Sequence, residues 1–193
     1  MLSRREKMAL SVLGALLLAI AIQLTRRMLV SDSIVGEDVV VSLEPLDLSE
    51  NLLAADEARV SASSHNVERQ KVDSLRDVRR TSYWHVALDR VGREAWVLVD
   101  FGPDRKKTVR RLMALPRMDI PRQFFRHARL LGSPNGETWE LVSEITEPTR
   151  PAIATWREWR FENDRAYRFY KFVIFDGYES GKFLSLAELA LFE

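Results

Sequence analysis

From residue 51 onward, short runs of alternating apolar and polar residues recur along the chain. A period of two is typical of half-buried strands, and turn residues separate the runs. The predicted strands are Arg59–Ala62, Ala95–Phe101, Val109–Leu115, Arg126–Gly132, Thr138–Val142, Trp156–Phe161, Arg168–Phe175 and Ala187–Phe192. No long run with a 3.6-residue period lies among them. The pattern predicts an all-β domain of the β-sandwich or jelly-roll class over residues 51–193.

One stretch, residues 130–142 (LLGSPNGETWELV), contains the strongest turn signal in the chain. Both residues of Asn135-Gly136 tolerate a positive φ, so they fit the tight turn that joins two antiparallel strands. We therefore expect a hairpin between the strands that end before Asn135 and begin near Trp139.

The N-terminal pattern is of another kind. Met8–Leu24 carries no charged residue, and arginines and a lysine flank it on both sides. Its seventeen residues are at the short end of the roughly 17 to 25 needed to cross a bilayer. We expect residues 1–27 to form a single transmembrane α-helix with basic flanks. The alternative is a cleaved signal peptide, since Ala19-Ile20-Ala21 has the form of a cleavage site, but Arg26-Arg27 would follow the cut awkwardly.

The chain after the apolar segment has an acidic part followed by a basic part. Residues 28–50 form an acidic connecting arm with one strand-like run, Val39–Val41, and from Met28 to Ala58 there is no basic residue. Arg59 onward is basic and rich in arginine, although the net charge of the whole chain is only +1. Basic residues number three before the apolar segment and two after it, which favours a cytoplasmic N-terminus and an extracytoplasmic domain, periplasmic in a Gram-negative source.

Composition excludes several kinds of site. The chain has no cysteine, hence no disulfide and no thiolate metal site or nucleophile. The three histidines lack metal-ligand spacing, and no HExxH, GxSxG, P-loop or dinucleotide-binding motif is present. We therefore expect a non-enzymatic protein without a cofactor.

Six motifs occur in a fixed order between residues 51 and 193. They are Asn51–Ala54 with Val60–Ser64, Thr81–Trp84, Trp96–Gly102, Val109–Arg117, Leu131–Trp139, and the pair Tyr167–Ile174 and Leu184–Phe192. In this order they resemble the coagulation factor V/VIII type C domain, which is discoidin-like and galactose-binding-like. The resemblance implies a jelly roll that acts as a binding module, with loops at one end contacting sugars, phospholipid head groups or proteins.

Many members of the resembled family also hold a structural calcium ion. Alignment on Trp84 places Asp77, Arg79 and Ser82 at ligand positions of one loop, and Glu188 at the acidic position of the last strand. A guanidinium brings charge of the wrong sign to a calcium site. We expect a degenerate site with no metal, either lost or filled by Arg79 pairing with Asp77 or Glu188.

The resemblance also indicates where a ligand or partner would bind. Aromatic, histidine and arginine residues in the expected loops are the candidates: His65, Tyr83, His85, Arg117, Arg122, Phe124, Phe125, Tyr178 and Phe183. The loop 117–125 mixes apolar and basic residues, so either it forms a membrane-dipping or protein-contacting spike or its phenylalanines fold back onto the core. His85 and His127 are more often framework residues than ligand contacts. The basic run 105–111 is expected at a solvated strand edge, or facing anionic lipid or the acidic arm.

Two functions follow from these patterns. The first is an anchored accessory subunit that docks on an integral membrane protein complex, favoured by the abundance of arginine at a surface. The second is a membrane-tethered carbohydrate-binding module, for cell-surface glycan or anionic lipid head groups, which rests on fold analogy. Nucleic acid is not expected as a partner outside the cytoplasm.

Overall fold

The computed structural model describes residues 47–54, 58–65, 71–87, 94–178 and 183–193, all of which belong to one compact unit. The strands of this part are β1 (Arg59–Ala62), β2 (Trp84–Ala87), β3 (Ala95–Asp100), β4 (Arg111–Leu115), β5 (Phe125–Ser133), β6 (Glu140–Thr146), β7 (Arg157–Arg160), β8 (Phe169–Gly177), β9 (Phe183–Leu186) and β10 (Glu188–Phe192). Short 3-10 helices lie between them: η1 (Leu52–Ala54), η2 (Val72–Arg76) and η4 (Pro121–Gln123).

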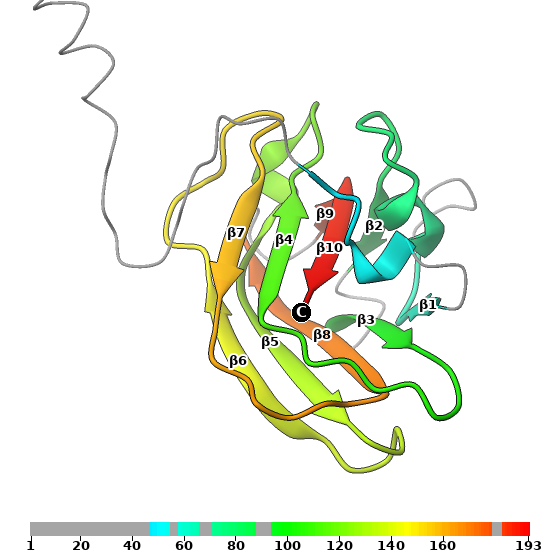
Figure 1. The fold of residues 1–193 in the computed structure, drawn as a ribbon. Helices are drawn as coiled ribbons and strands as arrows, with labels where there is room; N and C mark the ends of the chain where they lie inside the picture. Colours follow the sequence, from blue (N-terminus) through cyan, green and yellow to red (C-terminus); the bar gives the residue numbers. More distant parts are fainter. Residues whose placement is uncertain (1–46, 55–57, 66–70, 88–93, 179–182) are drawn as a thin grey trace, which may run out of the picture. The chain divides into compact units, whose positions relative to one another are not determined.

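The strands form a jelly-roll sandwich, which confirms the predicted fold class for the domain (Figure 1). A five-stranded antiparallel sheet has the order β1-β3-β8-β5-β6, and a three-stranded sheet has the order β10-β4-β7. The short strands β2 and β9 pair with each other. Each of the eight predicted strands is present, β1 with the predicted bounds and the other seven with shifted ends, whereas β2 and β9 were not predicted as a pair of strands.

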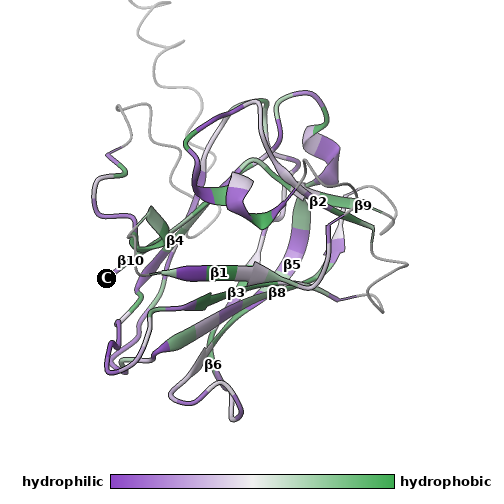
Figure 2. Ribbon diagram, turned by 90° about the vertical axis from the view of Figure 1, so that its right-hand side faces the viewer, coloured by the Kyte–Doolittle hydropathy of each residue, from purple (hydrophilic) through white to green (hydrophobic). Residues whose placement is uncertain are grey.

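The hydrophobic core lies between the two larger sheets. Val97 of β3 and Phe172 of β8 are cross-strand partners on the inner face of the five-stranded sheet, and Leu112 and Leu191 of the three-stranded sheet belong to the same buried cluster. In Figure 2, hydrophilic and hydrophobic residues alternate along β1, and the same residues alternate between exposed and partly exposed. Alternation of this kind buries one side of each strand and leaves the other side to solvent.

Hydrogen bonds from a few side chains fasten distant segments to this core. The Tyr170 hydroxyl of β8 donates to the Lys107 carbonyl at 2.7 Å and accepts from the Val109 amide at 3.1 Å. The Asn51 side-chain oxygen accepts from the Leu191 amide of β10 at 3.1 Å, which joins the first described residues of the domain to its last strand. Leu48 packs beside Met113, Ala190 and Phe192.

The hairpin predicted at Asn135-Gly136 is present, but its turn is longer than expected. Residues 134–139 connect β5 and β6, and Gly136 has a φ of 82°. The Asn135 side-chain oxygen accepts from the Glu137 and Thr138 amides at 3.0 and 3.1 Å. Asn135 therefore organises a wider loop through its side chain, a role that asparagine often takes in turns.

One further expectation, the placement of the basic run 105–111, receives an answer here, and the expected anchor does not. The basic run does not precede an edge strand, because β4 lies between β10 and β7 and is central in its sheet. Within the described ranges, no helix is long and apolar enough to cross a membrane. The expected anchor, residues 1–27, and nearly all of the expected arm, residues 28–50, lie outside those ranges, so both remain predictions.

Candidate functional site

Four of the predicted site residues meet around the short β2–β9 pair. In this pair His85 lies opposite Ser185, and Ala87 lies opposite Phe183. The His85 ring lies 5.3 Å from the Phe183 ring and 6.3 Å from the Tyr83 ring, measured between centroids. Tyr83 and Phe183 are partly exposed, whereas His85 is buried. We refer to Tyr83, His85, Arg117 and Phe183 as the loop cluster.

Arg117 reaches this cluster from the loop that follows β4. Its guanidinium carbon lies 3.7 Å from the centre of the Tyr83 ring, and its N–H groups donate to both Asp119 oxygens at 2.6 and 2.7 Å and to Gln123 at 3.1 Å. These bonds hold the pKa of Asp119 below its usual value. Arg117 is only 6% exposed, so a buried guanidinium holds the partly exposed Tyr83 ring in place.

The sequence did not single out two polar members of this neighbourhood. The Gln123 side-chain oxygen accepts from Arg117 and also from the Ser185 hydroxyl at 3.3 Å. Both residues are buried. Their side chains link the loop after β4 to β9, and only the β2–β9 pairing, which was not predicted, could have indicated this.

The remaining candidates do not join the loop cluster as exposed ligand groups. Phe124 and Phe125 are fully buried with ring centroids 4.5 Å apart, so the loop 117–125 folds its phenylalanines onto the core and is not an aromatic spike. The Tyr178 hydroxyl donates to the Glu147 carbonyl at 2.5 Å. His65 and Arg122 are exposed. The structure thus brings together four of the eight principal candidates, Tyr83, His85, Arg117 and Phe183, while a ligand-binding role stays a prediction for all eight.

The expected calcium position contains two carboxylates, but its donors do not fit calcium. The Ser82 hydroxyl donates to both Asp77 oxygens at 2.8 Å, and the Arg79 backbone amide donates to Asp77 at 2.8 Å. These donors occupy the Asp77 oxygens, whereas calcium requires six to eight oxygen ligands. Among the described residues, no group of three or more acidic or histidine side chains could hold a metal ion.

The Arg79 backbone amide closes this loop. Among the described residues no ion pair joins the Arg79 side chain to Asp77 or Glu188, which was one of the two expected alternatives. Glu188 is 4% exposed, and its Oε1 has no hydrogen-bond partner in the part of the chain that is described. Burial, and then the charge of Asp77, raise its pKa to about 7. Val78 has a φ of 58°, a left-handed conformation that is costly for a β-branched residue.

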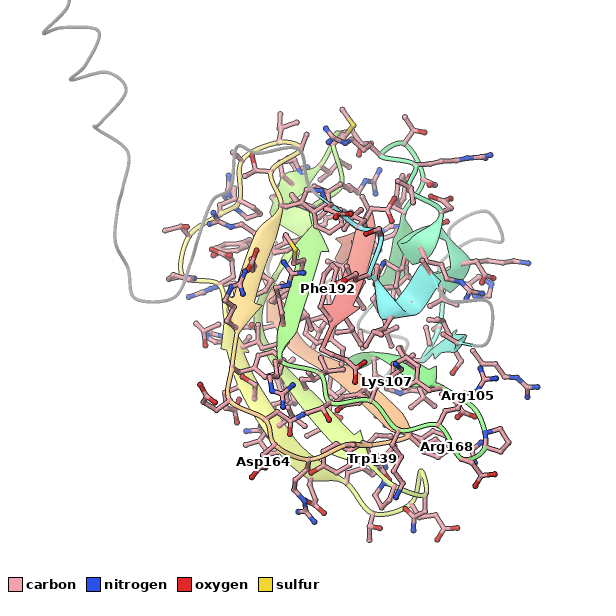
Figure 3. The ribbon with its side chains drawn as sticks, in the orientation of Figure 1. Arg105, Lys107, Trp139, Asp164, Arg168 and Phe192 are labelled. Atoms are coloured by element: carbon pink, nitrogen blue, oxygen red, sulfur yellow. The ribbon has the colours of Figure 1, made fainter. Side chains whose placement is uncertain are left out.

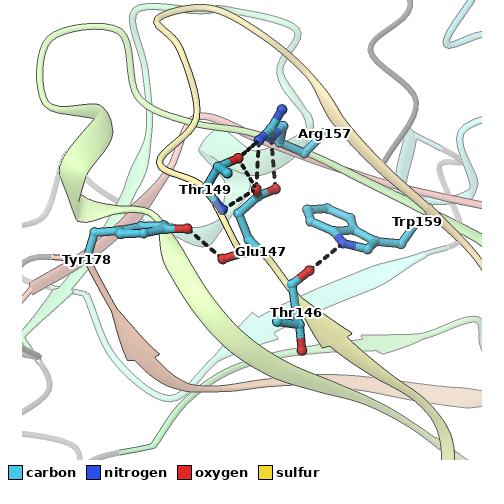
Figure 4. Close-up of polar contacts among 6 residues, drawn as sticks. All are labelled: Thr146, Glu147, Thr149, Arg157, Trp159 and Tyr178. Atoms are coloured by element: carbon cyan, nitrogen blue, oxygen red, sulfur yellow. Dashed lines mark hydrogen bonds and ion pairs between the residues drawn. The ribbon is translucent and has the colours of Figure 1, made fainter. Parts of the chain in front are cut away.

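A second polar cluster joins β6 to β7 in the interior (Figure 4). Arg157 donates to both Glu147 oxygens at 2.8 and 2.6 Å and to the Thr149 hydroxyl at 2.8 Å. Trp159 donates from its indole N–H to the Thr146 carbonyl at 3.1 Å. The Glu147 side chain is fully buried. The Glu147 carboxylate and the Thr149 hydroxyl are thus engaged by Arg157, so this cluster supports the fold.

Comparison with known proteins identifies the family. The model of the F5/8 type C domain matches residues 59–189, and the chain belongs to this family. No curated protein matches the chain.

Solved structures with the same fold include sugar-binding modules. CpGH89CBM32-5 from Clostridium perfringens, in complex with GalNAc-beta-1,3-galactose, is 18% identical with a TM-score of 0.62, over 74% of this chain and 99% of that one. The family 32 carbohydrate-binding module of NanJ from C. perfringens, in complex with galactose, is 21% identical with a TM-score of 0.60, over 75% and 98%. The family 32 module of AlyQ, in complex with 4,5-unsaturated mannuronic acid, is 18% identical with a TM-score of 0.56, over 70% and 94%.

Proposed function

We propose that this protein is a non-catalytic carbohydrate-binding module, tethered to a membrane by residues 8–24 with its domain on the extracytoplasmic side. The observation that carries the proposal is the loop cluster, in which a partly exposed tyrosine ring is held in place by a buried arginine. Similar folds solved with bound sugars support it. Of the two predicted functions, glycan binding therefore receives the stronger support.

Physical chemistry explains how the loop cluster would bind a sugar. The apolar face of a pyranose ring packs on the flat face of an aromatic side chain, which has large area and few rotatable bonds. Arg117 stacks on Tyr83 and is itself held by Asp119 and Gln123, so the ring is already oriented before a ligand arrives. Preorganisation of this kind lowers the entropic cost of binding.

A binding experiment on the full-length chain in mild detergent tests this proposal. The wild type is expected to bind a galactose- or GalNAc-containing glycan on an array and in calorimetry. Tyr83→Ala should weaken that binding about tenfold or more, because the platform is lost, while Tyr83→Phe should retain most of it. Ile153→Ala, which truncates an exposed apolar side chain between β6 and β7, is the matched control.

Absence of binding to any glycan on the array would contradict the proposal, as would undiminished binding by Tyr83→Ala. A thermal melt of each variant separates loss of the site from loss of the fold. Extraction of native membranes with alkaline carbonate tests the tether separately: the protein should remain in the pellet, and deletion of residues 1–27 should release it.

Docking on an integral membrane protein complex remains a prediction with less support. Its main argument was the abundance of surface arginine, and several arginines already form ion pairs within the domain, for example Arg129 with Glu144 and Arg168 with Asp100. Purification of the tagged full-length chain from native membranes tests it. A fixed set of integral membrane partners would favour docking over glycan binding.

A further inference from the structure

The outer face of the five-stranded sheet is unusually rich in apolar and aromatic side chains. One cross-strand row runs over four neighbouring strands. It consists of Leu98 of β3, Lys171 of β8, Leu131 of β5 and Leu141 of β6. Leu141 is 55% exposed, and the other three are partly exposed. Trp96 and Trp139 flank this row and are also partly exposed. We refer to Trp96, Leu98, Leu131, Trp139, Leu141 and Lys171 as the outer patch.

Cations lie over aromatic rings throughout this face. The Lys171 nitrogen is 4.8 Å from the Trp96 ring centre and 5.7 Å from that of Trp139. The guanidinium carbons of Arg129 and Arg168 lie 4.8 and 4.5 Å from Phe175 and Phe169. A cation within about 6 Å of a ring centre is attracted by the ring. Four such contacts lie on this one sheet face.

Lys171 differs from the arginines of the same face. Arg129 is paired with Glu144 and Arg168 is paired with Asp100. Among the described residues, no carboxylate pairs with Lys171, whose recorded contacts are with the two tryptophans. An ammonium carries three donors, and the aromatic contacts satisfy none of them as hydrogen bonds. The outer patch thus presents a cation between two indole rings that lacks an anion.

More positive charge lies at the end of this face. A groove there is lined by Arg59, Arg105 and Arg168 together with Asp100. Figure 3 labels Arg168, at the start of β8, and Trp139, just before β6, at the same end of the sandwich. Asp100 is engaged by Arg168. The charge of the groove and patch together is therefore positive, and it complements a ligand that carries several negative charges.

We propose that the outer patch is a second binding surface, specific for acidic polysaccharide, in which a sugar carboxylate pairs with Lys171 and sugar rings pack against Trp96 and Trp139. The inference rests on the proposed function for the class of ligand, but it concerns a different surface from the loop cluster. Charged hydrogen bonds contribute more than neutral ones, and the row of leucines excludes water from one side of the ion pair.

The alternative polyanion is single-stranded nucleic acid, which also combines aromatic stacking with cations. The charge argues against it, because nucleic-acid-binding domains have a strong positive excess, whereas residues 59–193 carry 24 lysines and arginines against 19 aspartates and glutamates.

The test is affinity electrophoresis of the full-length chain, in mild detergent, through gels that contain alginate, neutral dextran or no polymer. Wild type should be retarded by alginate and released by salt, since the ion pair is partly exposed. Lys171→Gln should weaken alginate binding about tenfold, and Lys171→Arg should restore most of it. Trp139→Ala should weaken it as well. Lys106→Gln is the matched control, because it removes the same charge from an exposed loop position.

The outcomes separate this inference from the proposed function. Loss of alginate binding in Lys171→Gln, with galactose-type binding retained, supports the second surface. If wild type binds a galactose-type glycan but not alginate, or if Lys106→Gln and Lys171→Gln weaken alginate binding equally, the second surface is refuted and the proposed function stands. Binding to an oligo-dT strand in preference to alginate would overturn the ligand class, and failure to bind any glycan would overturn both proposals.

Discussion

The two faces of β8 carry apolar side chains for different reasons. Tyr170, Phe172 and Ile174 point to the core and are at most 2% exposed, whereas Phe169, Lys171 and Phe175 on the other face are partly exposed. Burial explains the inner set completely, because burying an apolar side chain is worth about 1.5 to 3 kcal/mol. It does not explain Phe169 and Phe175, which remain partly exposed to water. The guanidinium groups of Arg168 and Arg129 lie over these two rings. The comparison teaches that hydrophobicity alone does not identify a core.

Truncating one phenylalanine on each face gives the sharpest test of this comparison. Phe172→Ala should lower the free energy of unfolding by about 3 to 5 kcal/mol, because it leaves a cavity between the sheets. Phe175→Ala should cost about 1 kcal/mol, since its ring is partly hydrated. Urea unfolding monitored by tryptophan fluorescence measures both values. Equal losses would show that the outer face is as tightly packed as the core.

Ion pairs extend the comparison from apolar to charged groups. Glu147→Gln should cost about 3 kcal/mol, because it leaves the buried Arg157 guanidinium without a counter-charge. Glu144→Gln removes the partner of Arg129 on the solvent side, where both groups are about half exposed, so the loss should stay below about 1 kcal/mol. Chemical denaturation of each variant and of wild type measures the two losses in the free energy of unfolding, which can then be compared. If Glu144→Gln lowered the free energy of unfolding as much as Glu147→Gln, the contrast between an exposed and a buried ion pair would be contradicted.

Of Phe172, Glu147 and Glu188, Glu188 is expected to change the free energy of unfolding least. Its contribution depends on pH. Its carboxyl has a pKa of about 7 in the folded domain, above the ordinary value of 4.5. The folded state therefore holds this proton more tightly than the unfolded state, so the stabilising contribution is complete below pH 4.5 and is lost as the pH rises through 7. Over this window the loss amounts to about 2 to 3 kcal/mol.

Comparison of melting temperatures at pH 5 and pH 8 tests this prediction. Wild type should lose stability between the two values, and Glu188→Gln should lose less, which makes the difference between the proteins the measure of Glu188. Added calcium should leave both melting temperatures unchanged. A calcium-dependent rise in wild type that is absent from Glu188→Gln would show that this position binds the metal after all.

Much of the fold could be predicted from the sequence, because alternation and turn residues are local signals. The five-stranded sheet follows from runs such as Ala95–Phe101, where apolar residues occur on both faces. The strands β2 and β9 were missed because nearly all of their positions are buried, so no alternation of apolar and polar residues marks them. Their pairing is also long-range, and no local pattern specifies which short segments meet.

The candidate site was predictable only in its residue types. Aromatic and basic residues in loops directed attention to Tyr83 and Arg117, but their stacking depends on how the loop after β4 folds. The same information placed Phe124 and Phe125 in that site, although tertiary packing buries them. The contact between Lys171 and Trp96 could not be predicted from the sequence, because it arises from the pairing of β3 with β8.

The bond between Asn51 and the Leu191 amide has a mechanical consequence. If residues 8–24 are fixed in a membrane, any pull on a bound ligand is transmitted to the anchor through the chain just before Asn51. This load reaches the last strand first, since Leu48 and Asn51 contact β10. The joint between tether and domain is therefore reinforced by β10, so resistance to force at this joint arises only after β10 has folded against Leu48 and Asn51.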